Sequence, residues 1–197
     1  MALVVALAAC GGPTEEELAI DLPSDPVDEL SLHNDEFCPK VMPRAPRETY
    51  GFGTGMPATD LPAFPAFDEA WLCTYQTRDI APKGSNGAWY EWVQTGLPRN
   101  LTPNELTSFS AAIGELDLLP TGDYACTADL GPRYLVSMAW ERDLTGVVVD
   151  DYGCRSVRLT DDPFVTIPGD ASQPGTVDGV LSSPEGLLAD LGVGRVR

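Results

Sequence analysis

The chain has 197 residues, 43% of them hydrophobic, which is enough for one ordinary buried core. Its formal net charge is −18, with 30 Asp and Glu against 12 Lys and Arg. A surface this acidic repels phosphate backbones, so the composition argues against nucleic acid as a partner. His33 is the only histidine, so a Ser-His-Asp triad, a Cys-His dyad or a multi-histidine zinc site would have to use this one residue.

The N-terminal sequence MALVVALAAC is an apolar run that ends at Cys10. Leu7 to Cys10 resembles the lipobox of bacterial lipoproteins, in which cleavage leaves the cysteine as a first residue carrying diacylglycerol and palmitate-type chains. The resemblance implies lipidation of Cys10. No Lys or Arg precedes the run, and we expect that the start codon has been assigned too late. The alternative is a hydrophobic segment folded into the core, because a transmembrane span needs about 20 apolar residues.

Residues 11–37 carry nine carboxylates and no Lys or Arg, so they hold half of the net charge. With three prolines and few aromatic residues, they bury too little apolar surface to offset the entropy of ordering. We therefore predict a signal peptide at 1–9, a lipidated and disordered acidic tether at 10–37, and a single folded domain at 38–197. The lipid on Cys10 would hold this domain at the extracytoplasmic face of the cell membrane.

Without Cys10, four of the five cysteines remain, and an even number outside the cytoplasm favours two disulfides. Three pairings are open. We expect Cys38 with Cys73 and Cys126 with Cys154, because each bond then staples one half of the domain. A zinc site is disfavoured because the sequence contains no C-x-x-C pair.

The beginning of the domain, residues 39–70, is rich in Pro and Gly and predicts irregular structure. The stretch GFGTG at 51–55 could suggest a phosphate-binding loop. However, no strand precedes it, no helix follows it, and the lysine of the phosphate-binding pattern is missing. We therefore expect a turn-rich loop.

Aromatic and β-branched residues at 71–78 and 88–95 flank a turn-forming run at 82–87 and predict a hairpin. Its aromatic side chains favour the core, with sugar stacking as the alternative. A capping box of Thr102 and Glu105 begins a helix that we expect to run from Pro103 to Leu116.

Alternation at 133–141 predicts a further strand, followed by a turn at Asp143 to Gly146 and another strand at VVVDDY. A short strand at 155–159 and a short helix after Ser183, ending at Gly192, complete the pattern. The predicted fold class is α+β, a mostly antiparallel sheet with one main helix packed on it, in the order ββαβββα.

The segment CTADLGPRYLVSMAW from Cys126, the tripeptide YGC ending at Cys154, and VRLTDDP at 157–163 together resemble uncharacterised secreted lipoproteins of high-GC bacteria, chiefly actinobacteria. In those proteins a C-x-A-D-x-G segment, a hairpin and a G-C are closed by a disulfide. The resemblance implies the pairing of Cys126 with Cys154 and implies no activity. Ten Arg against two Lys are consistent with such a genome.

Two Asp-Asp doublets, Asp150-Asp151 and Asp161-Asp162, offer carboxylates for acid–base chemistry on glycans or for Ca²⁺ binding. Neither lies in a calcium-loop pattern, and neighbouring strand residues point to opposite faces, so we expect solvated or capping roles. We assign no catalytic, metal or cofactor-binding residue. Our hypothesis is a non-catalytic domain that binds a protein, polysaccharide or small ligand. The alternatives are a carboxylate hydrolase acting on glycans and a calcium-dependent module.

Overall fold

The computed structural model describes residues 28–46, 51–84, 87, 89–120, 131–184 and 186–193. Their elements in chain order are α1 (Glu29–Leu32), β1 (Glu69–Asp79), β2 (Tyr90–Gln94), β3 (Arg99–Asn100), α2 (Pro103–Ile113), β4 (Asp117–Leu118), β5 (Arg133–Trp140), β6 (Asp143–Asp150), β7 (Ser156–Thr160), β8 (Val180–Ser182) and α3 (Leu187–Asp190). The signal-peptide prediction, the lipobox and most of the predicted tether lie outside the described residues.

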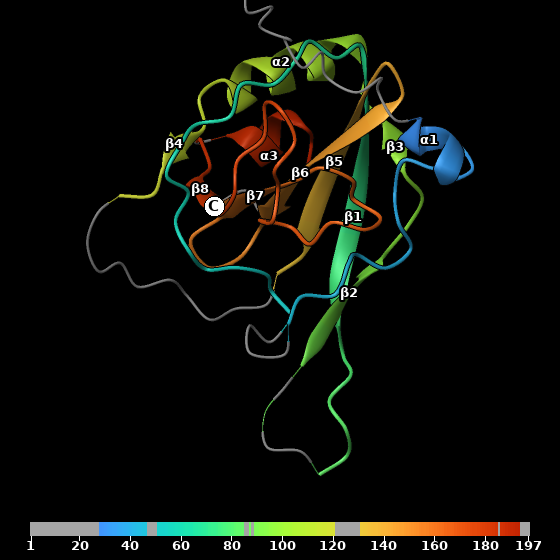
Figure 1. Cartoon of the computed structure of the whole chain (residues 1–197), viewed down its shortest axis with the longest axis vertical. Coiled ribbons are helices and arrows are strands. Elements are labelled where there is room, and N and C mark those ends of the chain that lie inside the picture. Colours follow the sequence, from blue (N-terminus) through green and yellow to red (C-terminus); the bar gives the residue numbers. More distant parts are fainter. Residues whose placement is uncertain are drawn as a thin grey trace, which may run out of the picture.

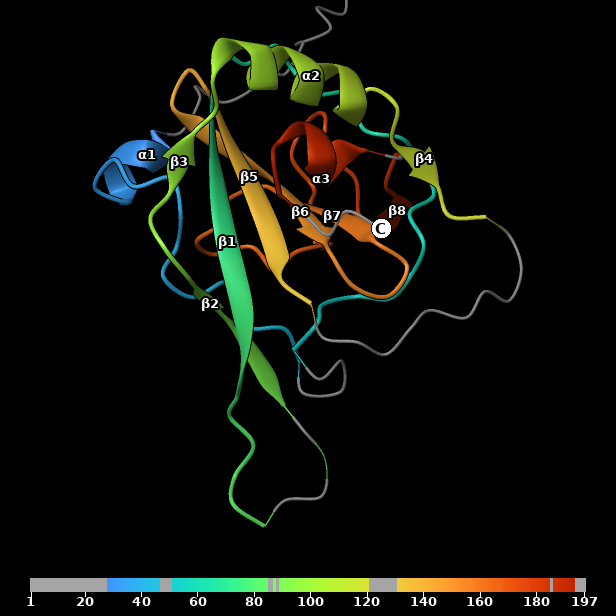
Figure 2. The same ribbon diagram turned by 180° about the vertical axis from the view of Figure 1, so that it is seen from behind.

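The described strands form one sheet in the order β2-β1-β5-β6-β7-β8-β4, with β3 also paired to β1. Every pairing between these strands is antiparallel. Figures 1 and 2 show α2 lying across one end of the sheet with α3 close by, and the β1–β2 hairpin extending beyond the body at the other end. The predicted α+β class, a mostly antiparallel sheet under one main helix, is confirmed. The short elements α1, β3, β4 and β8 were not predicted, so the predicted order ββαβββα is wrong in detail, and the described elements follow the order αβββαβββββα.

Helix α2 begins where its capping box predicts. The Thr102 side chain accepts from the backbone N–H of Glu105, and the Glu105 carboxylate accepts from the backbone N–H of Thr102. Gly114 caps the helix, which therefore ends at Ile113 and not at Leu116 as predicted.

Both faces of the sheet are covered. One face packs against α2 and α3, and its core includes Leu72, Phe109, Val136, Val147, Leu159, Leu181, Leu187 and Leu191. The opposite face carries a second cluster: Cys38, Met42, Cys73, Tyr75, Trp92, Leu135 and Val148. Trp92 is only 2% exposed, so the core interpretation of this predicted aromatic residue is confirmed.

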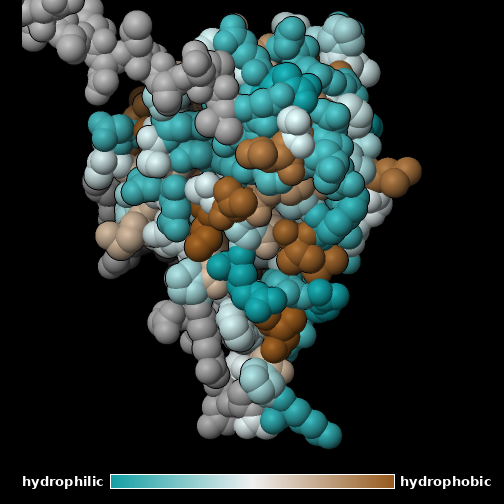
Figure 3. Space-filling model, turned by 45° about the vertical axis from the view of Figure 1, so that its right-hand side comes forward, coloured by the Kyte–Doolittle hydropathy of each residue, from teal (hydrophilic) through white to brown (hydrophobic). Residues whose placement is uncertain are grey.

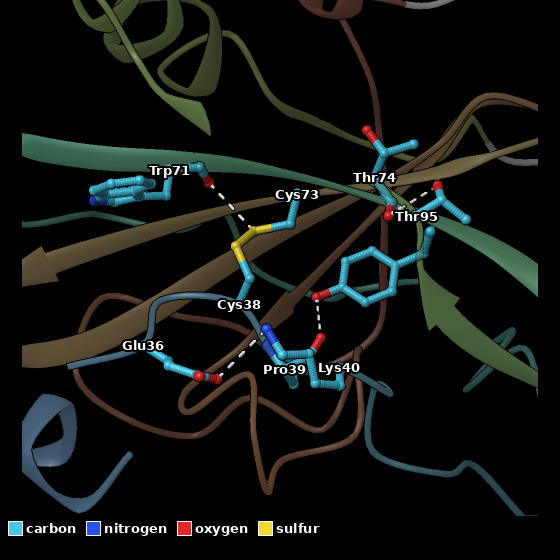
Figure 4. The surroundings of a disulfide bond; sticks show 9 residues. Glu36, Cys38, Pro39, Lys40, Trp71, Cys73, Thr74 and Thr95 are labelled. Atoms are coloured by element: carbon cyan, nitrogen blue, oxygen red, sulfur yellow. Dashed lines mark hydrogen bonds and ion pairs between the residues drawn. A yellow bond between two sulfur atoms is a disulfide. The ribbon is translucent and has the colours of Figure 1, made fainter. Parts of the chain in front are cut away.

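The predicted pairing of Cys38 with Cys73 is confirmed (Figure 4). The two Cα atoms lie 6.1 Å apart and both side chains are buried. Beside them, the Tyr75 hydroxyl donates to the backbone oxygen of Pro39 at 2.8 Å, so the segment after Cys38 is held to β1 twice. Cys154 is also disulfide-bonded. Cys126 lies outside the described residues, so its pairing with Cys154 stays a prediction.

The turn between β5 and β6 is not where the sequence predicts it. The turn residues are Glu141 and Arg142, and Gly146 lies within β6. A Cβ atom at Gly146 would lie 2.5 Å from Cγ2 of Thr160, so the glycine serves close packing between strands. The prediction of a turn at Asp143 to Gly146 was wrong because it assigned this glycine to a turn.

A buried network of charges joins this hairpin to the GFGTG loop. Asp150 accepts from Nε of Arg133 at 2.7 Å and from Nη1 of Arg158 at 2.6 Å. Arg133 also donates to the backbone oxygen of Phe52, and Arg158 to that of Thr54. The glycine-rich loop is thus bound through its carbonyl oxygens, as a structural loop, and the expectation of loop geometry is confirmed.

Asp150→Asn should lower the free energy of unfolding by about 3–5 kcal/mol, because it leaves two buried guanidinium groups without their countercharge. Urea unfolding of the two proteins measures the change. The control is Glu115→Gln, which removes one exposed charge and should stay within about 0.5 kcal/mol of the parent. A loss below about 1 kcal/mol for Asp150→Asn would show that the network is not essential to the core.

Candidate functional site

The segment around α1 packs on the end of the sheet, although the sequence assigns residues 28–37 to the tether. Leu30 is 3% exposed and packs with Ala139 and Leu144. Its backbone N–H donates to the oxygen of Arg142 at 3.2 Å. The acidic composition of this segment predicts a tether. The burial of one leucine and a few hydrogen bonds to residues distant in sequence are nevertheless enough to hold the segment on the sheet.

Arg142 ties both ends of this segment to the β5–β6 turn. Its Nε donates to Asp28 at 2.8 Å, and its Nη2 donates to Asp35 at 2.7 Å. All three side chains are largely exposed, so each ion pair stabilises only modestly. Their main effect is on geometry, because they hold Asp35 beside the turn.

The docked segment forms one wall of an open groove of about 890 Å³ at this end of the sheet. Its residues come from the α1 segment, the start of β1, and the end of β5 with its turn: Leu30, Asp35, Phe37, Ala66, Phe67, Asp68, Glu69, Ala139, Trp140, Glu141 and Arg142. The antiparallel register sets Glu69 opposite Ala139, which brings these segments together. A second hollow of about 460 Å³ shares Asp68 and Glu69, and extends the surface toward Leu106 of α2.

Carboxylates dominate the polar lining of the groove. Asp35, Asp68, Glu69 and Glu141 face one cation, Arg142, among the described lining residues. Glu69 accepts from Nε1 of Trp71 and from Nδ2 of Asn100, each at 3.1 Å.

Aromatic side chains supply the apolar part of the lining. Phe37 stacks on Trp71 with ring centroids 5.1 Å apart, and Phe67 packs edge-on to Phe109 at 6.1 Å. Trp140 is 47% exposed. The groove therefore presents carboxylates beside one exposed aromatic ring, that of Trp140.

The turn at the rim of the groove is strained. Glu141 has φ of +50° and Arg142 has φ of +75°, in the left-handed region that Gly, Asn and Asp favour in two-residue hairpin turns. Each of these side chains costs about 1–2 kcal/mol in that conformation. Backbone strain of this kind concentrates at functional sites, where a residue is present for its side chain although another residue would fit the backbone conformation better.

Two carboxyl groups meet where α1 packs on β6, one from Glu29 at the start of the helix and one from Asp143 at the start of the strand. Oε2 of Glu29 accepts from the backbone N–H of Leu144 at 2.9 Å, and the Glu29 side chain hydrogen-bonds that of Asp143. Burial, together with the nearby charges of Asp143 and Asp162, raises the pKa of Glu29 to about 8. Burial also raises the pKa of Asp143. The pair therefore holds a proton at neutral pH.

His33 holds the end of α1 to the loop after β7. Its Nε2 lies 2.8 Å from Oδ2 of Asp162, and its ring stacks on Phe164 with centroids 3.9 Å apart. From the sequence, His33 is assigned to the tether, and no functional role is predicted for it. Its contacts are those of a docking residue.

The two Asp-Asp doublets have different roles. Asp161 accepts from the backbone N–H groups of Ser172 and Gln173 and from Oγ1 of Thr176, so the expected capping role is confirmed there. The solvated role predicted for Asp150 was wrong, because the covering loop and two arginines bury it at 3% exposure. Across the described part of the chain, no three His, Cys, Asp or Glu side chains are placed to hold a metal ion.

Comparison with known proteins gives no relative from which a function could be carried over. The chain matches no protein-family model, no curated protein and no solved structure at a significant level. Among the described residues, none of the helices has the length and apolar character that crossing a bilayer requires.

The carboxyl pair makes stability depend on pH. The pKa of Glu29 rises from its ordinary 4.5 to about 8 on folding, so its protonated form is favoured in the folded protein. Stability should therefore fall as pH rises from about 4.5 to about 8. Glu29→Gln, which keeps the acceptor for Leu144 and a donor for Asp143, should weaken this dependence.

Urea unfolding at pH 5, 7 and 9 tests the effect. Glu115→Gln, an exposed substitution, should keep the slope of the parent protein. An equal slope in Glu29→Gln and in the parent would show that the pair does not hold the proton.

Proposed function

We propose that this chain is a lipid-anchored, extracytoplasmic binding domain with a non-catalytic role, whose ligand lies in the groove between the α1 segment and the β5–β6 turn. The observation that carries the proposal is the convergence of three separate segments on one groove of about 890 Å³. Its lining combines carboxylates with the exposed ring of Trp140. Binding sites of soluble proteins combine these features, a concave surface with apolar walls and a few placed polar groups.

The strained turn supports the same proposal. Asn or Gly at position 141 would relieve the backbone, yet the chain carries Glu there, with its carboxylate at the groove. A residue that lowers stability through its backbone conformation at the rim of a groove is typical of a side chain that takes part in binding.

A glycan hydrolase is the second candidate, because carboxylates from separate elements meet in the groove. Such an enzyme needs a carboxylic acid with a raised pKa beside the substrate. The pKa values of Glu29 and Asp143 are raised, but neither residue is among the described residues that line the groove. One oxygen of Glu29 is also occupied by the Leu144 N–H. These observations favour binding over hydrolysis.

The anchor is proposed from the lipobox resemblance at Leu7 to Cys10. Expressed behind a complete lipoprotein signal, the protein should partition into the detergent phase. Each CH₂ group of its two or more acyl chains contributes about 0.8 kcal/mol of binding free energy when it is buried. Cys10→Ala should move it to the aqueous phase or leave it unprocessed, whereas Gly12→Ala should behave as the parent. Unchanged detergent partitioning of Cys10→Ala would contradict lipidation at this residue.

A photocrosslinking residue at position 140 tests occupancy of the groove in the native envelope. We expect a discrete adduct from position 140. The matched control is position 97, where Leu97 is 92% exposed between β2 and β3 and lines no described groove. Equal adducts from the two positions, or no adduct from either, would contradict a binding site in the groove.

A further inference from the structure

The lining of the groove accepts hydrogen bonds far better than it donates them. Ionised carboxylates are acceptors only. The one cationic donor among the described lining residues, Arg142, already binds Asp28 and Asp35. The exposed carboxylates of Asp68 and Glu141 accept no hydrogen bond and form no ion pair with any other described residue. A ligand that satisfies this groove must bring its own donors.

We infer that the groove recognises a basic polypeptide segment of a partner protein, whose Lys or Arg side chains meet the carboxylates of Asp68, Glu69 and Glu141. The inference rests on the proposed binding function and specifies its ligand. Guanidinium and ammonium groups supply several N–H donors each, together with the opposite charge.

The aromatic rings of the groove suit the same ligand. A cation within about 6 Å of an aromatic face is attracted by the ring quadrupole, most strongly by tryptophan. This protein already uses the interaction twice among its described residues: the guanidinium of Arg133 lies 4.2 Å from the ring centroid of Trp92, and that of Arg44 lies 5.5 Å from that of Trp89. Trp140, exposed at the rim, offers a third tryptophan face.

The surface around α1 also fits a charged partner better than an apolar one. Figure 3 shows this side of the molecule with hydrophobic residues in separate patches among hydrophilic ones. No broad apolar face is visible on the described residues in this view. With a net charge of −18, the whole chain attracts basic partners over distance and raises the rate of encounter.

The shape of the site favours a segment of chain over a single small cation. The main groove and the neighbouring hollow share Asp68 and Glu69, so the acidic surface continues from the turn toward α2. Both hollows are open to solvent. An extended basic peptide can place successive side chains along this length.

The test measures binding of labelled hexaarginine to the full chain by fluorescence anisotropy at 150 mM salt. Glu141→Asn removes a groove carboxylate, and asparagine tolerates the left-handed conformation. We expect its affinity to fall about fivefold while its melting temperature rises by about 2 °C. Trp140→Leu should weaken binding about threefold. Glu115→Gln removes the same charge outside the groove and should bind as the parent does.

Each other outcome overturns the inference. An equal loss of affinity in Glu115→Gln and Glu141→Asn would show binding to the acidic surface in general. Absence of hexaarginine binding would exclude a basic ligand. Binding of a neutral oligosaccharide such as chitohexaose that depends on Trp140, without binding of hexaarginine, would assign the groove to glycans and leave the proposed binding function standing. If no probe responds to the groove variants and position 140 gives no photoadduct, the binding function fails as well.

Discussion

The register of the β5–β6 hairpin is the constraint on which the rest of the structure depends. Arg133 pairs with Asp150 at one end of the hairpin, and Trp140 pairs with Asp143 at the other. Because side chains alternate between faces, a slip of one residue would move Arg133 into the hydrophobic face under α2. The buried bonds of Asp150 to Arg133 and Arg158 make that slip costly.

The groove follows from this register. With Trp140 opposite Asp143, Glu141 and Arg142 must form the turn, and Arg142 then reaches Asp28 and Asp35 of the α1 segment. Burial of Leu30 supplies about 1.5–3 kcal/mol of the docking, more than the exposed ion pairs do. The two ends of the β5–β6 hairpin thus serve two different roles. One end holds buried charges for stability, and the other exposes carboxylates at a groove.

The sequence predicted the elements whose signals are local. The capping box at Thr102 located α2, and the turn-forming run at 82–87 located the β1–β2 hairpin. An even number of cysteines favoured disulfides, and the choice of one bond for each half of the domain predicted Cys38 with Cys73. Each of these signals lies within one element or in the covalent chemistry of the chain. Local patterns of this kind do not depend on the rest of the fold.

The candidate site was not predictable from the sequence, because it depends on distant contacts. The α1 segment carries a charge run typical of a tether, and only the packing of Leu30 on Ala139 and Leu144 reveals its docking. The prediction put the β5–β6 turn in the wrong place because the residues that form it, Glu141 and Arg142, are not typical turn residues. The buried role of Asp150 depends on two arginines and on a loop about a hundred residues earlier in sequence.

The most direct test of the central claim is a map of where a basic ligand binds on the full chain. Backbone NMR of the ¹⁵N-labelled protein titrated with hexaarginine should shift the amides of residues 35–37, 66–69 and 139–142. The amides around Arg133 and Asp150, at the other end of the hairpin, should stay unchanged. Shifts confined to the acidic residues 11–27, or spread evenly over the surface, would contradict the account.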